Sequence, residues 1–140
     1  MKIPRHILVR VLMVLYICAV AYLCFGSFDS IPDMNKGLLK FLTDKVVHFC
    51  MFLPFPVLAA LCRKNLPPSA SKAAISIVLI FLLGCAFAAS TELIQGRLTY
   101  RSCDIRDFGA DALALLLGSV AVGISVAIRL SREPSRDTLA

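Results

Sequence analysis

The chain has 140 residues, of which 59% are hydrophobic and 17% are charged, with a net charge of +6 and a mean hydropathy of +0.81. A soluble domain usually carries about 25% charged residues, and a chain this short has too much surface to keep so many apolar residues away from water. The composition therefore excludes an ordinary soluble enzyme and a disordered chain, and it predicts one membrane domain over residues 1–140.

Four apolar stretches are each long enough to cross a bilayer. A spanning helix needs about 20 mostly apolar residues, and only helices and closed barrels satisfy their backbone hydrogen bonds in lipid. The stretches are continuous rather than alternating, which favours helices over barrel strands. We therefore predict an all-α membrane protein, a bundle of four transmembrane helices at about residues 6–26, 43–62, 72–96 and 104–129, with a polar tail at 130–140.

The first apolar stretch, Ile7 to Phe25, has a second interpretation as part of a signal peptide, because Lys2 and Arg5 precede it. It is longer than the about 7–15 apolar residues of a signal peptide, and no small-residue cleavage motif follows it. We expect it to remain as the first membrane helix.

The second predicted helix begins with ionisable residues. Asp44 and His48 are four positions apart and so share one helical face, and Lys45 lies between them in the sequence. Further along, Pro54 and Pro56 are expected to kink this helix, which membrane helices tolerate.

The third helix ends, and the fourth begins, with further polar residues. Glu92 and Gln95 are three apart and share a face. Asp104, Asp107 and Asp111 follow the spacing i, i+3, i+7 and form one stripe about 10 Å long. Asp104 has an alternative role as a helix N-cap, and Asp107 as an acidic residue favoured in the first helical turn.

An antiparallel bundle brings these three helix ends together. A lone Asp at a helix centre costs about 2.5–3.5 kcal/mol on insertion scales, so deep ionisable groups should meet partners. We predict that His48, Glu92, Asp107 and Asp111 meet in one polar cavity near the outer surface, with Arg101 at its rim. A purely structural network between helices is the alternative interpretation.

The cysteines do not indicate a disulfide framework or a metal site. Five of the six lie within apolar stretches, where Cys behaves as a small hydrophobic residue, and only Cys103 is expected in a loop. The sequence has no C-x-x-C pair and no Cys/His cluster. We therefore predict neither a bound metal nor a cofactor.

The distribution of Lys and Arg predicts the orientation in the membrane. With four helices, the two termini and the loop between the second and third helices share one side, which carries nine cations and two acids, a charge of +7. The other side carries six cations and seven acids, a charge of −1. Cytoplasmic loops carry the excess of Lys and Arg, so both termini are predicted in the cytoplasm. The basic character then reflects topology and anionic lipid, and no nucleic-acid motif is present.

Three short motifs resemble those of the VanZ-like membrane proteins: Asp44-Lys45-x-x-His48-Phe49, Glu92-x-x-Gln95 and Arg101-x-x-Asp104-x-x-Asp107. The resemblance covers about residues 29–120. Two positions depart from the family, which usually has Asn at Asp111 and Gly at Ala114. The resemblance implies a multi-pass protein of the bacterial inner membrane and a link to low-level resistance to the glycopeptide teicoplanin. The candidate binding residues are Asp44, Lys45, His48, Glu92, Gln95, Arg101, Asp104, Asp107 and Asp111.

Two functions from different classes fit these residues. In the first, the cluster binds an envelope component, such as a lipid-linked intermediate, or an amphiphilic compound, with carboxylates taking its amines and Lys45 and Arg101 its anionic groups. In the second, His48 acts with Asp44 or Glu92 as a general acid/base on a lipid-linked headgroup. Alternatively, His48 with Asp107 and Asp111 forms an oxygen-rich metal site for the same substrate. No G-x-S-x-G nucleophile motif is present, which favours binding without catalysis.

Overall fold

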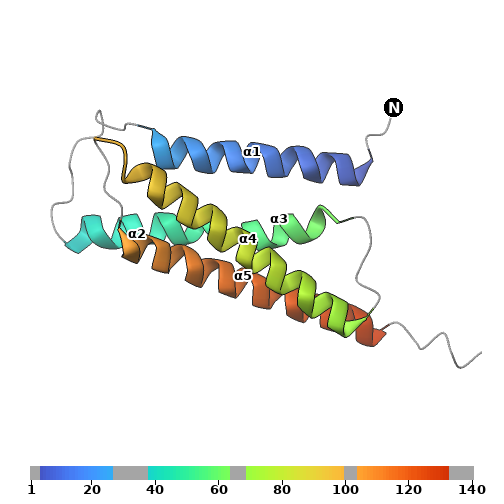
Figure 1. Ribbon diagram of the computed structural model, residues 1–140. Helices are drawn as coiled ribbons and strands as arrows, with labels where there is room; N and C mark the ends of the chain where they lie inside the picture. The colour runs from blue at the N-terminus through green and yellow to red at the C-terminus, as the bar shows by residue number, and fades with distance from the viewer. Residues whose placement is uncertain (1–3, 27–37, 64–68, 100–103, 133–140) are drawn as a thin grey trace, which may run out of the picture.

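A computed structural model describes residues 4–26, 38–63, 69–99 and 104–132, and within these ranges the regular structure is helical (Figure 1). Four helical segments are long and apolar enough to cross a membrane: Arg5–Phe25, Asp44–Leu61, Ala70–Gln95 and Ile105–Arg132. The predicted all-α fold with four membrane-spanning segments is therefore confirmed, and the protein is a multi-pass membrane protein. The helices are α1 (Arg5–Phe25), α2 (Leu38–Phe52), α3 (Phe55–Leu61), α4 (Ala70–Gln95) and α5 (Ile105–Arg132).

The second predicted helix differs most from the structure. It begins at Leu38 rather than at residue 43, and it is divided at Leu53 and Pro54 into α2 and α3. Proline has no backbone N–H and its ring clashes with the preceding helical turn, so Pro54 ends the regular hydrogen-bond ladder. Pro56 is tolerated because it lies in the first turn of α3, where N–H groups have no helical acceptor. Where the sequence predicts a kinked but continuous helix, the structure has two separate helices, α2 and α3.

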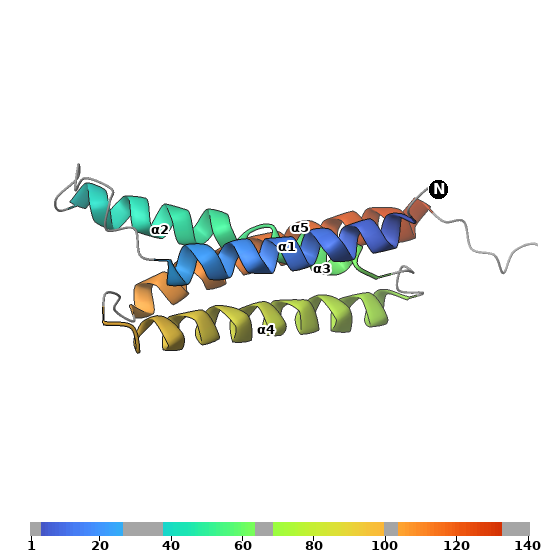
Figure 2. The same cartoon turned by 90° about the horizontal axis from the view of Figure 1, so that it is seen from above.

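The chain runs back and forth along the bundle. α1 begins at the end where α5 finishes, while α4 finishes at the end where α2 and α5 begin (Figure 1). α5 packs against α2, α3 and α4, and α1 packs against α3 and α4. Seen from above, α1 crosses in front of α3 and α5, with α4 along one side (Figure 2). The start of α5 therefore lies among the helix ends that carry the polar motifs.

Small residues let α5 approach its neighbours closely. A Cβ atom added to Gly118 would lie 2.8 Å from the backbone oxygen of Leu53 and 3.0 Å from Pro56. Ala114 is fully buried on the same helix, and Ala88 is fully buried on α4. Since small residues allow close backbone contact between membrane helices, these positions fix how α5 lies against the break between α2 and α3.

The core is apolar, and many large apolar side chains also face outward. Phe52 and Phe55, on either side of the helix break, both contact the ring of Phe87 on α4, with ring centroids 5.5 and 6.0 Å apart. Val20 and Cys24 of α1 complete this core. The outward apolar side chains suit a lipid environment, because lipid is as apolar as the core.

The cysteines of the described segments are free thiols, in agreement with the sequence analysis. Cys103, which is predicted in a loop, lies outside the described residues.

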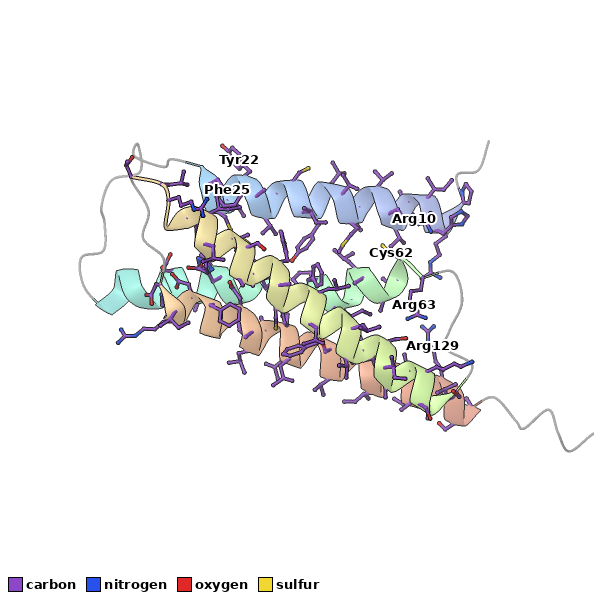
Figure 3. The ribbon with its side chains drawn as sticks, in the orientation of Figure 1. Arg10, Tyr22, Phe25, Cys62, Arg63 and Arg129 are labelled. Carbon is purple, nitrogen blue, oxygen red and sulfur yellow. The ribbon has the colours of Figure 1, made fainter. Side chains whose placement is uncertain are left out.

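The two ends of the bundle differ in charge. Figure 3 shows Arg10, Arg63 and Arg129 at the end where α1 begins and α5 finishes. Tyr22 and Phe25 lie at the opposite end, where α4 finishes and the predicted polar residues gather.

Candidate functional site

Lys45 lies at the centre of one group of acidic side chains. Its Nζ is 3.0 Å from Asp104 Oδ2 and 3.6 Å from Asp44 Oδ2, and it also makes a short ion pair with Asp107. We call Asp44, Lys45, Asp104 and Asp107 the Lys45 group. It joins the start of α2 to the start of α5. The ammonium expected to bind anionic groups of a ligand is thus already engaged by carboxylates of this chain.

One helical turn further along α2, His48 lies in a second group with Glu92 of α4 and Asp111 of α5, which we call the His48 group. His48 Nδ1 is 3.2 and 3.4 Å from the two carboxyl oxygens of Asp111, and 3.9 Å from Glu92 Oε1. The three residues are 5%, 3% and 0% exposed, respectively. Three helices therefore bring three ionisable side chains together in the interior of the bundle.

Glu92 connects the two groups. Its Oε2 accepts a hydrogen bond of 3.1 Å from the backbone N–H of Asp104, which holds the carboxyl group against the start of α5. Its Oε1 is fully buried and accepts no hydrogen bond from the residues that the structure describes. A buried polar atom without a partner is unfavourable by about 1–3 kcal/mol, so this oxygen has unused binding capacity.

Asp104 has two roles. Its Oδ1 accepts a hydrogen bond of 2.9 Å from the backbone N–H of Arg106, as expected for a helix N-cap, and its Oδ2 contacts Lys45. The backbone hydrogen bond from Arg106, followed by the hydrogen bond from Lys45, holds the pKa of Asp104 below its ordinary value of 3.8. Asp104 therefore caps α5 and also stays ionised in weak acid.

Gln95 has a different neighbour from Glu92. Although the two residues are three positions apart, the Gln95 side chain donates a hydrogen bond of 2.9 Å to the backbone oxygen of Cys24. It therefore ties the end of α4 to the end of α1. Arg101, predicted at the rim of the cluster, lies outside the described residues.

The structure also gives a tertiary contact that sequence reasoning missed. The Tyr16 hydroxyl of α1 donates a hydrogen bond of 2.6 Å to the backbone oxygen of Met51, in the last turn of α2. Carbonyl groups in the last turn of a helix have no partner within that helix. The kink predicted at Pro54 was therefore the available signal that a carbonyl acceptor would be free near Met51.

The geometry of the ligand atoms allows metal binding in two places. One set is Asp44, His48 and Asp107, and the other is the His48 group, and in each set the ligand atoms lie within 4.8 Å of one another. His48 belongs to both sets. Both sets combine ligands from more than one helix, so they do not form a recognisable metal motif along the sequence.

Comparison with known proteins gives no assignment. No protein-family model matches the chain, and neither a curated protein nor a solved structure matches it. The motifs and the geometry of the two groups are therefore the basis for a functional proposal.

Proposed function

We propose that this protein is a VanZ-like integral membrane protein of the bacterial inner membrane that recognises a cell-envelope component or an amphiphilic compound. The Lys45 and His48 groups together form its recognition site, which we call the polar cluster. The observation that carries the proposal is an excess of acid. Among the described residues, the cluster brings five carboxyl groups together with one Lys and one His at one end of the bundle.

This excess of carboxyl groups favours a ligand with an amine or another cationic group. Hydrogen bonds between an ammonium group and a carboxylate are about twice as strong as those between neutral partners. The side chains of Asp44 and Asp104 are 46% and 35% exposed, so they are accessible to a ligand at the membrane surface. We favour two ligand types, a lipid-linked intermediate and a glycopeptide. The glycopeptide is included because the VanZ-like motifs imply a link to teicoplanin resistance.

The charge of the two ends supports an orientation of the protein in the membrane. The arginine-rich end carries both helix ends that lead to the chain termini, and Lys and Arg are enriched on the cytoplasmic side of membrane proteins. This supports cytoplasmic termini and an outward-facing polar cluster. The test is a reporter enzyme that functions only outside the cytoplasm, fused to the C-terminus. Activity of this reporter would contradict the proposed orientation.

The test compares variants at equal amounts of inserted protein. Glu92→Gln, His48→Ala and Asp107→Asn should each abolish binding of teicoplanin to membranes and the associated drug tolerance, because each removes a charge or ligand atom from the cluster. Asp104→Asn should do less, because an amide still caps the helix. Ser119→Ala is the control, because this buried hydroxyl is on α5 but outside both groups.

Full activity in all three cluster variants would show that the cluster serves only to join the helices. Loss of activity in Ser119→Ala as well would show a general sensitivity of α5 to substitution.

The contact between His48 and Asp111 favours a second candidate, acid/base catalysis on a lipid-linked headgroup. The neighbouring hydroxyls do not support a nucleophilic mechanism, because Ser90 and Thr91 donate to carbonyl groups of their own helix. Release of a headgroup from extracted envelope lipids by the purified protein, but not by His48→Ala, would favour this candidate over binding alone.

A further inference from the structure

We propose that His48, Glu92 and Asp111 form a binding site for one divalent transition-metal ion, and Zn²⁺ is the ion used to test the site. The proposal goes beyond the recognition function. It does not depend on that function, because the three residues come from one chain and their metal binding can be measured without an envelope component or a drug. The sequence analysis considers a metal site of His48 with Asp107 and Asp111 as one alternative, whereas the structure brings Glu92 to His48 and Asp111.

The spacing of the ligand atoms supports this proposal. Zn²⁺ binds nitrogen and oxygen ligands at about 2.0–2.2 Å, so two ligands of one tetrahedral ion lie about 3.4 Å apart. His48 Nδ1 is 3.2 and 3.4 Å from the oxygens of Asp111 and 3.9 Å from Glu92 Oε1. Small side-chain adjustments would bring all three onto one ion.

Glu92 provides an independent observation. Its Oε1 lies 3.9 Å from His48 Nδ1 and has no hydrogen-bond partner among the described residues. A carboxyl oxygen of Glu92 also lies within 4.8 Å of the ligand atoms of His48 and Asp111. A direct hydrogen bond between His48 and Asp111 leaves this oxygen unsatisfied, whereas a shared ion would satisfy it. The other oxygen of Glu92 is held by the backbone N–H of Asp104, and such supporting hydrogen bonds commonly orient metal ligands.

The charge balance also favours a cation. The nearest ammonium group, that of Lys45, is engaged by Asp44, Asp104 and Asp107 in the neighbouring group. Two buried carboxylates without a cation would be strongly unfavourable in a low-dielectric interior, and a divalent ion would balance their charge.

The ligand types indicate which ions would bind. Mg²⁺ and Ca²⁺ prefer sites made only of oxygen, whereas imidazole suits Zn²⁺ and iron. Asp44, His48 and Asp107 form the second set of close ligand atoms, and Asp44 is the most exposed of these.

The experiment measures Zn²⁺ bound to the purified full-length protein after a chelator has removed metal. In equilibrium dialysis, the wild type should bind about one Zn²⁺ per chain and should not bind Mg²⁺ under the same conditions. Asp111→Asn, His48→Ala and Glu92→Gln should each weaken Zn²⁺ binding by at least about tenfold. Co²⁺ should give a visible spectrum that changes in the same variants.

Two control variants separate this site from other sources of Zn²⁺ binding. Ser119→Ala removes a buried polar group of α5 that lies outside both groups, and it should alter Zn²⁺ affinity by less than about threefold. Replacement of all cysteines by serine should leave the Zn²⁺ stoichiometry unchanged, which excludes binding by thiolates.

A further variant distinguishes a metal ligand from a structural residue. Glu92→His replaces one ligand type by another and should keep Zn²⁺ bound, while Glu92→Gln should not. Folded wild type that binds no Zn²⁺ would overturn the proposal, as would unchanged Zn²⁺ affinity in the folded His48→Ala and Glu92→Gln variants. The measurement requires no envelope component or drug, so its outcome is separate from that of the proposed function.

Discussion

The Lys45 group and the His48 group lie side by side but are balanced in different ways. In the Lys45 group, three carboxylates surround an ammonium group from the same chain, and Lys45 itself is 16% exposed. In the His48 group, two carboxyl groups face a single imidazole, and each residue is buried. Both groups join α2 to α5, and only the His48 group includes a side chain from α4.

The difference suggests a division of roles. The Lys45 group has its own cation, so it can join two helices without any other molecule. The His48 group has an imidazole but no ammonium or guanidinium group in the described contacts, and it needs a proton or a bound cation to balance both acids. We therefore regard the Lys45 group as the part that joins α2 to α5 and presents Asp44 and Asp104 at the surface, and the His48 group as the part that binds a metal ion.

The largest effect on stability is expected from Lys45→Met. Removing one partner of a buried ion pair leaves the others uncompensated, and we expect a loss of about 2 kcal/mol, less than for a fully buried pair because solvent reaches Lys45. The double variant Lys45→Met/Asp107→Leu should recover more than half of this loss, because an apolar pair can replace a buried ion pair. Reversible unfolding in detergent measures both.

Stability unchanged in Lys45→Met would show that the Lys45 group does not stabilise the contact between α2 and α5. Loss of Zn²⁺ binding in a folded Lys45→Met variant would show that the two groups do not act separately.

A smaller effect is expected from Gly118→Ala, which disturbs the packing between the helices rather than either polar group. The new methyl group would contact the backbone oxygen of Leu53, and overpacking of this kind is unfavourable by about 1–3 kcal/mol. Gly109→Ala is the matched control, because nothing lies within 4 Å of its added Cβ. Thermal unfolding of the two variants should give a lower midpoint for Gly118→Ala only.

Equal midpoints for the two glycine variants would indicate that α5 moves away from Leu53 without loss of stability. In that case the close approach at Gly118 would not determine the position of the polar residues on α5.

The smallest effect concerns Asp104, whose pKa is held below 3.8 by the hydrogen bonds from Arg106 and Lys45. A carboxyl group with a lowered pKa in the folded state stabilises the fold at pH above its unfolded pKa, and this stabilisation is lost as the pH falls through the folded pKa. The difference in unfolding midpoint between wild type and Asp104→Asn should therefore be present at about pH 6, begin to decrease near about pH 4 and be lost only below the folded pKa of Asp104. A difference that persists in stronger acid would point to the N-cap, not to the charge of Asp104.

Much of the fold could be predicted because membrane insertion depends on local composition. Continuous apolar stretches specify helices wherever they occur, so the number, order and approximate ends of the spanning segments followed from the sequence. The same local rule placed Asp44, Glu92 and Asp104 near one end of an antiparallel bundle. The expectation that polar side chains of three helices meet there is confirmed by the contacts of His48 with Glu92 and Asp111.

Only the tertiary structure decided which side chains meet. The spacing of Glu92 and Gln95 predicted that both side chains lie on the same face of α4. In the structure, Glu92 joins the His48 group, whereas Gln95 donates a hydrogen bond to the backbone of α1. Sequence reasoning assigned Lys45 to the anionic groups of a ligand, whereas the structure pairs it with Asp104 and Asp107. The rotation of each helix about its axis settles these pairings. Rotation depends on packing, and Gly118 allows α5 to approach the break between α2 and α3 closely. Hydropathy carries no information on rotation, because lipid and an apolar core accept the same side chains.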